Sequence, residues 1–311
     1  MIPSSLRRRA AGGLAVALAV AMVAGCGSSS DSASSTTPPT TAPPTTSAPT
    51  TSAATGASDM TSASSASEMT SASEATSAAP DDLSGTLTVY AAASLKKTFD
   101  QLRTDFMAAH PDVEFAEITY DGSSTLATQL INGAQADVFA SADLNNMKKV
   151  TDESLIVGDP VNFATNTLQI AVAPGNPKGI TDLASLAAAD LKVVLCAPEV
   201  PCGNAAQKAL DAAGVSVTAV SEEQNVTAVL TKVETGDADA GLVYKTDVAG
   251  SDGGVDGVDF PEAADAVNEY PIGVLTAAED AGNTAAASAF VSMVTGAEGQ
   301  QVLADAGFGA P

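Results

Sequence analysis

The feature that most constrains this chain is a strand that leads directly into a helix at residues 86–100 (TLTVYAAASLKKTFD). Leu87 and Val89 are typical of a buried strand, whereas apolar residues recur at helical spacing from Leu95 onward. The pattern predicts that Ser94 is the N-cap of the helix, where unpartnered backbone N–H groups and a partial positive charge favour anions. Ser94 is therefore a candidate anion contact, although a serine N-cap that only stabilises its helix is the more common case.

A second hydroxylated turn follows at the spacing expected for the next strand and helix. Residues 113–120 (VEFAEITY) alternate like a strand, the turn DGSS follows, and Leu126 and Leu130 give the next helix an apolar face. Ser123 is predicted to repeat the role of Ser94. Two such turns lie where ligands bind in open α/β sheets, beyond the carboxyl ends of the strands.

Strands alternate with helices through the remainder, which predicts an α/β fold with mostly parallel sheets. Residues 191–195 and 215–220 are predicted strands, and residues 284–304 form a helical stretch. The passages 133–143 (GAQADVFASAD) and 236–247 (GDADAGLVYKTD) echo each other. The echo indicates either pseudo-symmetry between two similar lobes or coincidence.

The N-terminus is typical of a lipoprotein signal peptide over residues 1–25. Arginines 7–9 precede a 15-residue apolar run at 10–24, shorter than the about 20 residues of a membrane span, and small residues precede Cys26. Cleavage before Cys26 and acylation of its thiol would anchor the mature protein to the cell membrane. The alternative is an ordinary secretory signal with an incidental cysteine.

Residues 26–82 are almost wholly Ser, Thr, Ala and Pro, a composition that predicts a disordered tether. The 229 residues that follow are enough for two modest lobes. They carry 10 Lys and Arg against 31 Asp and Glu, a net charge of −21. This balance argues against binding to nucleic acid or to an anionic membrane surface.

Two cysteines remain beyond the tether. Cys196 and Cys202 lie six positions apart and flank the turn APEVP, which in an extracytoplasmic protein favours a disulfide over two buried thiols. With His110 as the only histidine, the chain has too few ligands for a structural zinc site.

The sequence offers little for catalysis or for a cation. His110 precedes Pro111 at the expected end of a helix, and no nucleophile elbow, phosphate loop or metalloprotease motif is present. Asp252, Asp256 and Asp259 lack the ordered ligands and closing glutamate of a calcium loop. We therefore expect no enzyme, no cofactor and no cation site.

Five motifs, in order and at similar spacing, resemble the molybdate-binding proteins that serve ABC transporters: AAASL (91–95), DGSSTLATQL (121–130), ADVFASAD (136–143), CGNAAQKAL (202–210) and AGLVYKTD (240–247). The resemblance extends from about residue 85 to the end of the chain. It implies a two-lobed periplasmic-binding-protein fold of type II, in which each lobe is a mostly parallel sheet flanked by helices and the ligand lies in the cleft. The implied lobes are 83–168 plus 268–311 (lobe I) and 169–267 (lobe II).

The resemblance also implies a set of ligand contacts. Ser94 and Ser123 would donate hydroxyls and nearby backbone N–H groups from lobe I. Lobe II would supply backbone N–H groups at Cys202 and Val226 and the hydroxyl of Tyr244. Cys202 departs from the small residue common in the family, although a backbone donor survives that change. The alternative for Tyr244 is a half-buried aromatic whose hydroxyl reaches water or a carbonyl.

The expected site consists of hydroxyls and amides. Arg103 is the only arginine beyond the signal peptide, so there is no basic clamp, and no carboxylate acceptor is evident. Such a site suits a fully deprotonated tetrahedral dianion, molybdate or tungstate, with sulfate rejected by pocket size. We expect a monomeric extracytoplasmic lipoprotein that delivers molybdate to the permease of an ABC importer. The alternatives are a receptor for another oxyanion, such as sulfate or phosphate, and a structural or adhesive surface lipoprotein.

Overall fold

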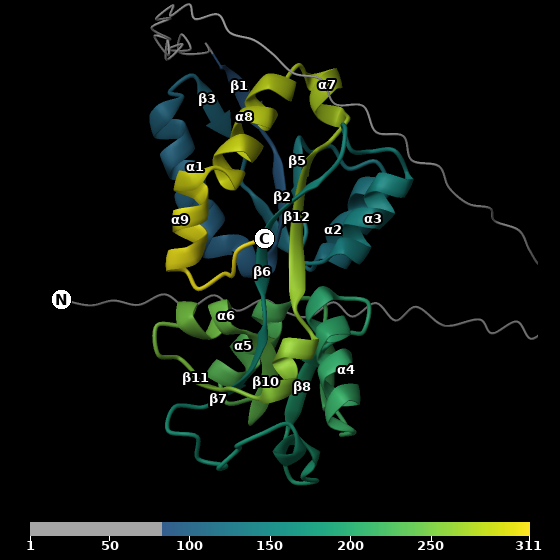
Figure 1. The fold of residues 1–311 in the computed structure, drawn as a ribbon, viewed down its shortest axis with the longest axis vertical. Helices are drawn as coiled ribbons and strands as arrows, with labels where there is room; N and C mark the ends of the chain where they lie inside the picture. The colour runs from purple at the N-terminus through teal and green to yellow at the C-terminus, as the bar shows by residue number, and fades with distance from the viewer. Residues whose placement is uncertain (1–82) are drawn as a thin grey trace, which may run out of the picture. The chain divides into compact units, whose positions relative to one another are not determined.

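The computed structural model of the protein describes residues 83–311. The predicted signal peptide, the lipidation site Cys26 and the tether lie outside the described residues. Two five-stranded sheets organise the described part, and each sheet with its helices forms one lobe (Figure 1). A short parallel pair, β1 (Gly85–Leu87) and β3 (Val113–Phe115), adds to the first lobe.

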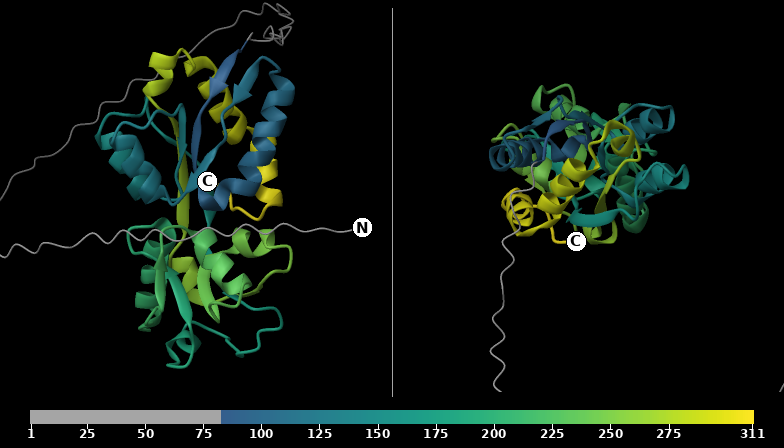
Figure 2. Two further views of the ribbon diagram at one scale, coloured as in Figure 1. Left: turned by 180° about the vertical axis from the view of Figure 1, so that it is seen from behind. Right: turned by 90° about the horizontal axis from the view of Figure 1, so that it is seen from above.

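Lobe I is built on the sheet with strand order β4-β2-β5-β12-β6. Its strands are β2 (Val89–Ala92), β4 (Thr119–Asp121), β5 (Val138–Ala140), β6 (Val161–Asn166) and β12 (Asn268–Val274). Its helices are η1 (Ala93–Leu95), α1 (Lys96–Ala109), α2 (Ser123–Ile131), α3 (Leu144–Asp152), α7 (Ala277–Ala281), α8 (Thr284–Thr295) and α9 (Ala297–Asp305). Figures 1 and 2 show α1, α8 and α9 on one side of the sheet and α2 with α3 on the other.

Lobe II is built on the sheet with strand order β11-β7-β10-β8-β9. Its strands are β7 (Leu168–Val172), β8 (Val193–Cys196), β9 (Ser221–Glu223), β10 (Ala240–Tyr244) and β11 (Asp256–Val258). Its helices are η2 (Ala184–Ala187), α4 (Pro201–Ala213), α5 (Val226–Glu234), α6 (Lys245–Gly250) and η3 (Pro261–Asp265).

The two sheets share one strand pattern. In lobe I, β2 runs parallel to β4 and β5, while β12 is antiparallel to both β5 and β6. In lobe II, β8 runs parallel to β9 and β10, while β7 is antiparallel to both β10 and β11. Each sheet therefore has four strands in one direction and one reversed strand, which confirms the predicted two-lobed α/β fold with mostly parallel sheets.

The chain crosses between the lobes twice. The first crossing is Thr167, which alone separates the end of β6 in lobe I from the start of β7 in lobe II. The second crossing, Ala266 and Val267, leads from η3 back into β12. The last residues of β2, β4 and β10, which are Ala92, Asp121 and Tyr244, line one cavity together.

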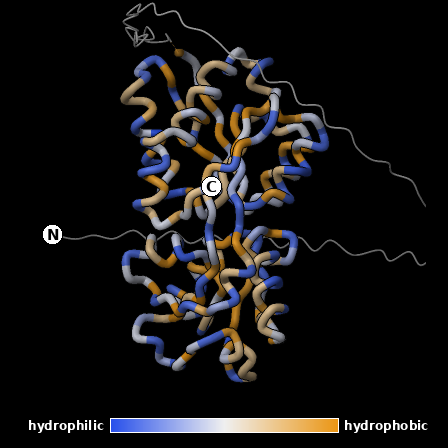
Figure 3. The backbone as a smooth tube through the Cα atoms, in the orientation of Figure 1, coloured by the Kyte–Doolittle hydropathy of each residue, from blue (hydrophilic) through white to orange (hydrophobic). Residues whose placement is uncertain are grey.

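Each lobe buries its own apolar core. In lobe I, Phe99, Phe106, Phe115, Phe163 and Phe290 pack edge to face or tilted around α1 and α8. The core of lobe II is mainly aliphatic, from strands β7, β8 and β10 and helices α4 and α5. Figure 3 shows hydrophobic residues along the strands inside both lobes.

Three predicted elements differ in the structure. The predicted strand 113–120 is two strands, because β3 pairs with β1 whereas β4 pairs with β2. Residues 215–220 form no strand, and β9 begins at Ser221 instead. The helical tail 284–304 is broken at Gly296, whose extended backbone (φ −80°, ψ 174°) ends α8 and begins α9.

Candidate functional site

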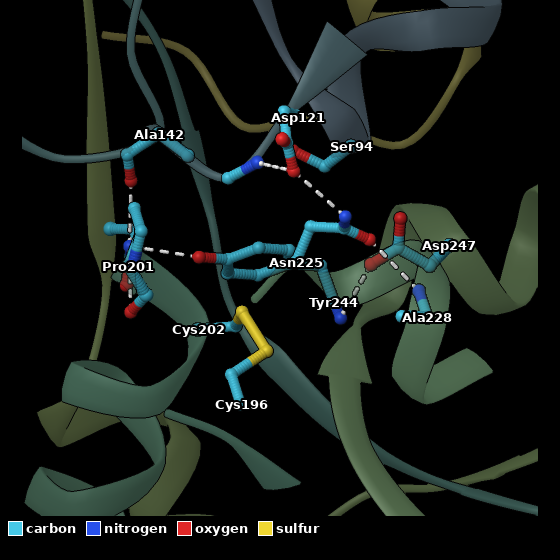
Figure 4. Close-up of a disulfide and its surroundings, with 12 residues drawn as sticks. Ser94, Asp121, Ala142, Cys196, Pro201, Cys202, Asn225, Ala228, Tyr244 and Asp247 are labelled. Carbon is cyan, nitrogen blue, oxygen red and sulfur yellow. Dashed lines mark hydrogen bonds between the residues drawn. A yellow bond between two sulfur atoms is a disulfide. The ribbon is translucent and has the colours of Figure 1, made fainter. Parts of the chain in front are cut away.

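A small cavity lies between the lobes and is lined by residues of both. The volume in which the centre of a water-sized sphere can move is about 10 Å³. Pockets for drug-sized organic ligands measure roughly 300–1,000 Å³, so this cavity suits a compact ion. All five predicted contacts line it: Ser94, Ser123, Cys202, Val226 and Tyr244. Figure 4 shows part of this site.

Ser94 lies inside η1, the 3₁₀ turn between β2 and α1. The N-cap of η1 is Ala92 and that of α1 is Leu95, and neither makes a side-chain capping bond. The prediction that Ser94 caps the helix is therefore wrong, because the extra turn moves it out of the capping position. Its hydroxyl instead shares a 3.0 Å hydrogen bond with the hydroxyl of Tyr270 on β12, in which either group can donate.

Ser123 is the first residue of α2, and Gly122 occupies the N-cap position that the sequence assigned to the serine. Its side chain is fully buried, and its Oγ accepts a hydrogen bond from the backbone N–H of Ala142 at 2.9 Å. A hydroxyl that accepts in this way keeps its own proton for another partner. Ser123 can therefore donate into the cavity.

Two helices of lobe II begin at the cavity. Cys202 is the second residue of α4, behind Pro201, which has no N–H to satisfy at the first helical position. Val226 is the first residue of α5, whose N-cap Asn225 accepts from the N–H of Ala228 at 2.9 Å. N–H groups in the first turn have no intrahelical partner, and the helix dipole makes this end positive. Both helices thus present backbone donors to an anion.

The predicted disulfide between Cys196 and Cys202 is confirmed, with Cα atoms 5.7 Å apart. It ties the end of β8 to the first turn of α4. The backbones are close here, since a Cβ on Gly203 would lie 2.0 Å from the carbonyl oxygen of Ala197. The bond and this contact together fix the donor end of α4 against the sheet.

Tyr244 ends β10 and is 1% exposed. Its hydroxyl accepts a 3.0 Å hydrogen bond from the side-chain amide of Asn268, which leaves the hydroxyl proton available. Burial raises the pKa of Tyr244 well above its ordinary value, so the group stays protonated. The side chain is therefore fully buried and not half-buried, and its hydroxyl meets the amide of Asn268 and not water or a carbonyl.

The sequence reasoning missed a carboxylate at the cavity. Asp121, at the end of β4, lines the cavity, and its Oδ1 accepts from the N–H of Gly122 at 2.7 Å and from the amide of Asn225 at 2.9 Å. The expectation of a site without a carboxylate acceptor is therefore wrong. The position of Asp121 directly before the Gly-Ser turn was the sequence signal that could have indicated this carboxylate.

The electrostatics of the cavity come from dipoles, because no lysine or arginine lines it in the described part of the chain. Three helix N-termini, those of α2, α4 and α5, meet there. Arg103 and Lys96 line a separate, larger cavity of about 630 Å³, which also touches Asn225. These two cations therefore line the larger cavity and not the small one.

Two further observations concern residues 83–311. They contain no helix of the length and apolarity that crossing a membrane requires. Nor do they bring three His, Cys, Asp or Glu side chains together as a group that could hold a metal ion.

Comparisons with known proteins agree with this fold. The chain is 48% identical over 234 residues to the molybdate-binding protein ModA of Mycobacterium tuberculosis (strain H37Rv), covering 75% of this chain and 88% of that protein. The periplasmic molybdate-binding protein of Azotobacter vinelandii has the same fold, with a TM-score of 0.62 and 21% identity over 72% of this chain and 99% of that one. So does the sulfate-binding protein SubI of M. tuberculosis, with a TM-score of 0.62 and 16% identity over 72% and 86% of the two chains.

A family model described as bacterial extracellular solute-binding protein matches residues 87–309. This match covers both lobes and every predicted ligand contact. The chain belongs to the family of bacterial extracellular solute-binding proteins.

Proposed function

We propose that this protein binds molybdate, and tungstate, and delivers the ion to the membrane permease of an ABC importer. The observation that carries the proposal is the convergence of Ser94, Ser123, Cys202, Val226 and Tyr244 on one cavity of about 10 Å³. The 48% identity to a molybdate-binding protein supports the choice of ion. The fold alone does not decide it, since the molybdate and sulfate receptors match the chain equally well in TM-score.

The proposed binding mode uses three hydroxyls and two backbone N–H groups from opposite lobes. Hydrogen bonds to an ionised acceptor are about twice as strong as neutral ones. The three helix N-termini each add a charge equivalent to about +0.5, which opposes the two negative charges of the ion without a cation. Release then requires only that the lobes separate, since no ion pair and no covalent bond holds the ligand. This reading assigns no catalytic role and no cofactor to the protein.

Asp121 favours a second candidate, a receptor for an oxyanion that keeps a proton, such as phosphate. A carboxylate at the cavity can accept that proton in a hydrogen bond, whereas it repels a full dianion. Its Oδ1 already accepts two hydrogen bonds, which reduces the repulsion. A direct binding test with each ion therefore distinguishes the two candidates.

A screen of thermal unfolding with molybdate, tungstate, sulfate and phosphate tests the assignment. A ligand that binds only the folded state raises its stability by RT ln(1 + [L]/Kd), about 2.7 kcal/mol at a concentration of 100 Kd. We expect a clear shift with molybdate and tungstate. A shift with phosphate or sulfate, and none with molybdate or tungstate, would establish the second candidate instead.

We also propose that the protein is a monomeric lipoprotein anchored at Cys26, with lobe I at 83–168 plus 268–311 and lobe II at 169–267. The strand membership of the two sheets supports these lobe boundaries to within two residues, since β6 ends at Asn166, β7 begins at Leu168 and β12 begins at Asn268. Replacing Cys26 with serine should move the protein from the membrane fraction to the soluble fraction. A Cys26→Ser protein that stays in the membrane fraction would contradict the anchor.

A further inference from the structure

Opposite the crossing strands, the two lobes touch through a pair of polar side chains. The Nδ2 of Asn225 in lobe II donates to the Oδ1 of Asp121 in lobe I at 2.9 Å, across 104 residues of sequence (Figure 4). Other hydrogen bonds between the lobes involve Asn166 and Asn268, which adjoin the crossings themselves. Bonds next to a crossing change little when the lobes rotate, whereas the Asp121–Asn225 bond must break.

The backbones are also in close approach at this contact. A Cβ added to Gly122 would lie 2.0 Å from the carbonyl oxygen of Gln224, far inside van der Waals distance. The backbone of Gly122 is in an ordinary conformation (φ −60°, ψ 136°), so glycine is needed here for space and not for its torsion angles. Any side chain at this position would hold the lobes apart.

Each partner in the bond is also fixed to a helix that serves the cavity. Asp121 accepts from the N–H of Gly122, the residue before Ser123 and α2. Asn225 uses its Oδ1 to cap α5 through the N–H of Ala228, and Val226 follows it directly. The bond therefore joins the N-terminus that carries the Ser123 hydroxyl to the N-terminus that carries the Val226 donor.

We propose that Asp121 and Asn225 form an interlobe latch that positions Ser123 and Val226 around the ligand and holds the cleft closed. The effect of the latch on ligand release rests on the proposed function, whereas its effect on closure of the lobes does not. The latch stabilises closure before the ligand arrives and slows release after binding. An ion pair also joins the lobes, Lys97–Asp252 at 3.6 Å, but both of its side chains are largely exposed and it contributes little.

The variant Asn225→Asp removes the hydrogen bond to Asp121 but keeps the N-cap of α5. An aspartate at 225 still accepts from the N–H of Ala228, but it presents a second carboxylate to Asp121 where an amide donor stood. We expect dissociation of molybdate, followed by stopped flow, to become about tenfold faster, equivalent to about 1.4 kcal/mol. Adding Asp121→Asn restores a donor and an acceptor with the roles exchanged, and the rate should return to within about threefold of the original.

Closure can be measured without any ligand. Spin labels at cysteines replacing Glu114 of lobe I and Lys208 of lobe II, both exposed, report the distance between the lobes by pulsed electron paramagnetic resonance. In a Cys26→Ser background only these sites are labelled. The unliganded protein should populate the short distance, and Asn225→Asp should shift the population to longer distances.

Gly122→Ala provides a second route to the open state, because its methyl group blocks the approach of Gln224 and removes no hydrogen-bonding group. Its control is Gly250→Ala in α6, where the nearest atom to an added Cβ is 3.8 Å away. We expect Gly122→Ala to open the lobes and Gly250→Ala to leave the distance unchanged.

Unchanged distances and unchanged dissociation in both Asn225→Asp and Gly122→Ala would overturn the latch. So would an Asp121→Asn, Asn225→Asp protein that stays as open as the single variant. If instead the distances shift as expected but no tetrahedral oxyanion binds the unaltered protein, the latch stands and the proposed function fails.

Discussion

The side-chain amide of Asn268 donates to the hydroxyl of Tyr244 at 3.0 Å and to the carbonyl oxygen of Ala142 at 2.7 Å. One residue at the start of β12 therefore ties the tyrosine of lobe II to the cavity wall of lobe I. Since the amide supplies the proton in the first bond, the Tyr244 hydroxyl remains a donor. This orientation is the basis for the first prediction.

Tyr244→Phe should weaken molybdate binding about ten- to a hundredfold, because a charge-assisted hydrogen bond contributes roughly 1.5–3 kcal/mol. The lost bond with Asn268 should lower the free energy of unfolding by about 1 kcal/mol. Titration calorimetry measures the affinity, and Tyr90→Phe on β2, away from the cavity, is the control. Unimpaired binding in Tyr244→Phe would remove the tyrosine from the site.

Two adjacent serines in α2 provide a matched pair. Ser123→Ala removes a cavity donor and leaves the Ala142 N–H without its acceptor, so both affinity and stability should fall, the latter by about 1–3 kcal/mol. The Ser124 hydroxyl is buried and has no partner among the described residues, so Ser124→Ala should bind normally and unfold at an equal or higher temperature. Equal affinities of the two variants would contradict the role of Ser123.

Removing the disulfide should destabilise the protein modestly and weaken binding. The loop-closure entropy of so short a loop is equivalent to about 2 kcal/mol, which corresponds to a fall in Tm of roughly 4–8 °C for a folded part of this size. The Cys196→Ala, Cys202→Ala protein should also bind more weakly, because the first turn of α4 is no longer fixed to β8. A loss of stability with unchanged affinity would mean that the bond does not position the donor.

The half-buried carboxyl of Asp247 should make stability fall as pH rises. Burial raises its pKa from 3.8 to about 7, against the hydrogen bond from the Tyr244 N–H, which lowers it. Between about pH 4 and 7 the folded protein keeps a proton that the unfolded chain has lost, so the free energy of unfolding falls by up to about 1.4 kcal/mol per pH unit from this group. Burial raises the pKa of Asp143 as well, which adds to the same trend.

Urea unfolding at pH 5 and pH 7 measures this slope. Asp247→Asn keeps an oxygen to accept from Tyr244 but cannot ionise, so its stability should depend less on pH. Glu223 and Asp239 have lowered pKa values and so act in the opposite sense, but both proteins carry them and their effect cancels from the comparison. An identical slope in the variant would exclude Asp247 as the titrating group.

Local sequence patterns predict much of the fold. The strand-to-helix turns before Ser94 and Ser123 follow from the change of period from two to 3.6, which neighbouring residues determine. The disulfide also follows from a short spacing. These features do not depend on distant parts of the chain, so the sequence alone could predict them.

Other features arise only from contacts between distant residues. The pairing of Asp121 with Asn225 spans 104 positions, and that of Ser94 with Tyr270 spans 176. No local pattern shows that a carboxylate will face the cavity or that a serine hydroxyl will reach another strand. The split of residues 113–120 has the same cause, because its two halves pair with different partners.

The position of β12 determines the order in which the molecule can form. This strand lies between β5 and β6 in the sheet of lobe I, yet the chain reaches it only after all of lobe II. Lobe II is continuous in sequence and can fold during synthesis, whereas the sheet of lobe I must wait for residues 268–274. We therefore expect refolding in two phases, with binding competence recovered only in the slower one.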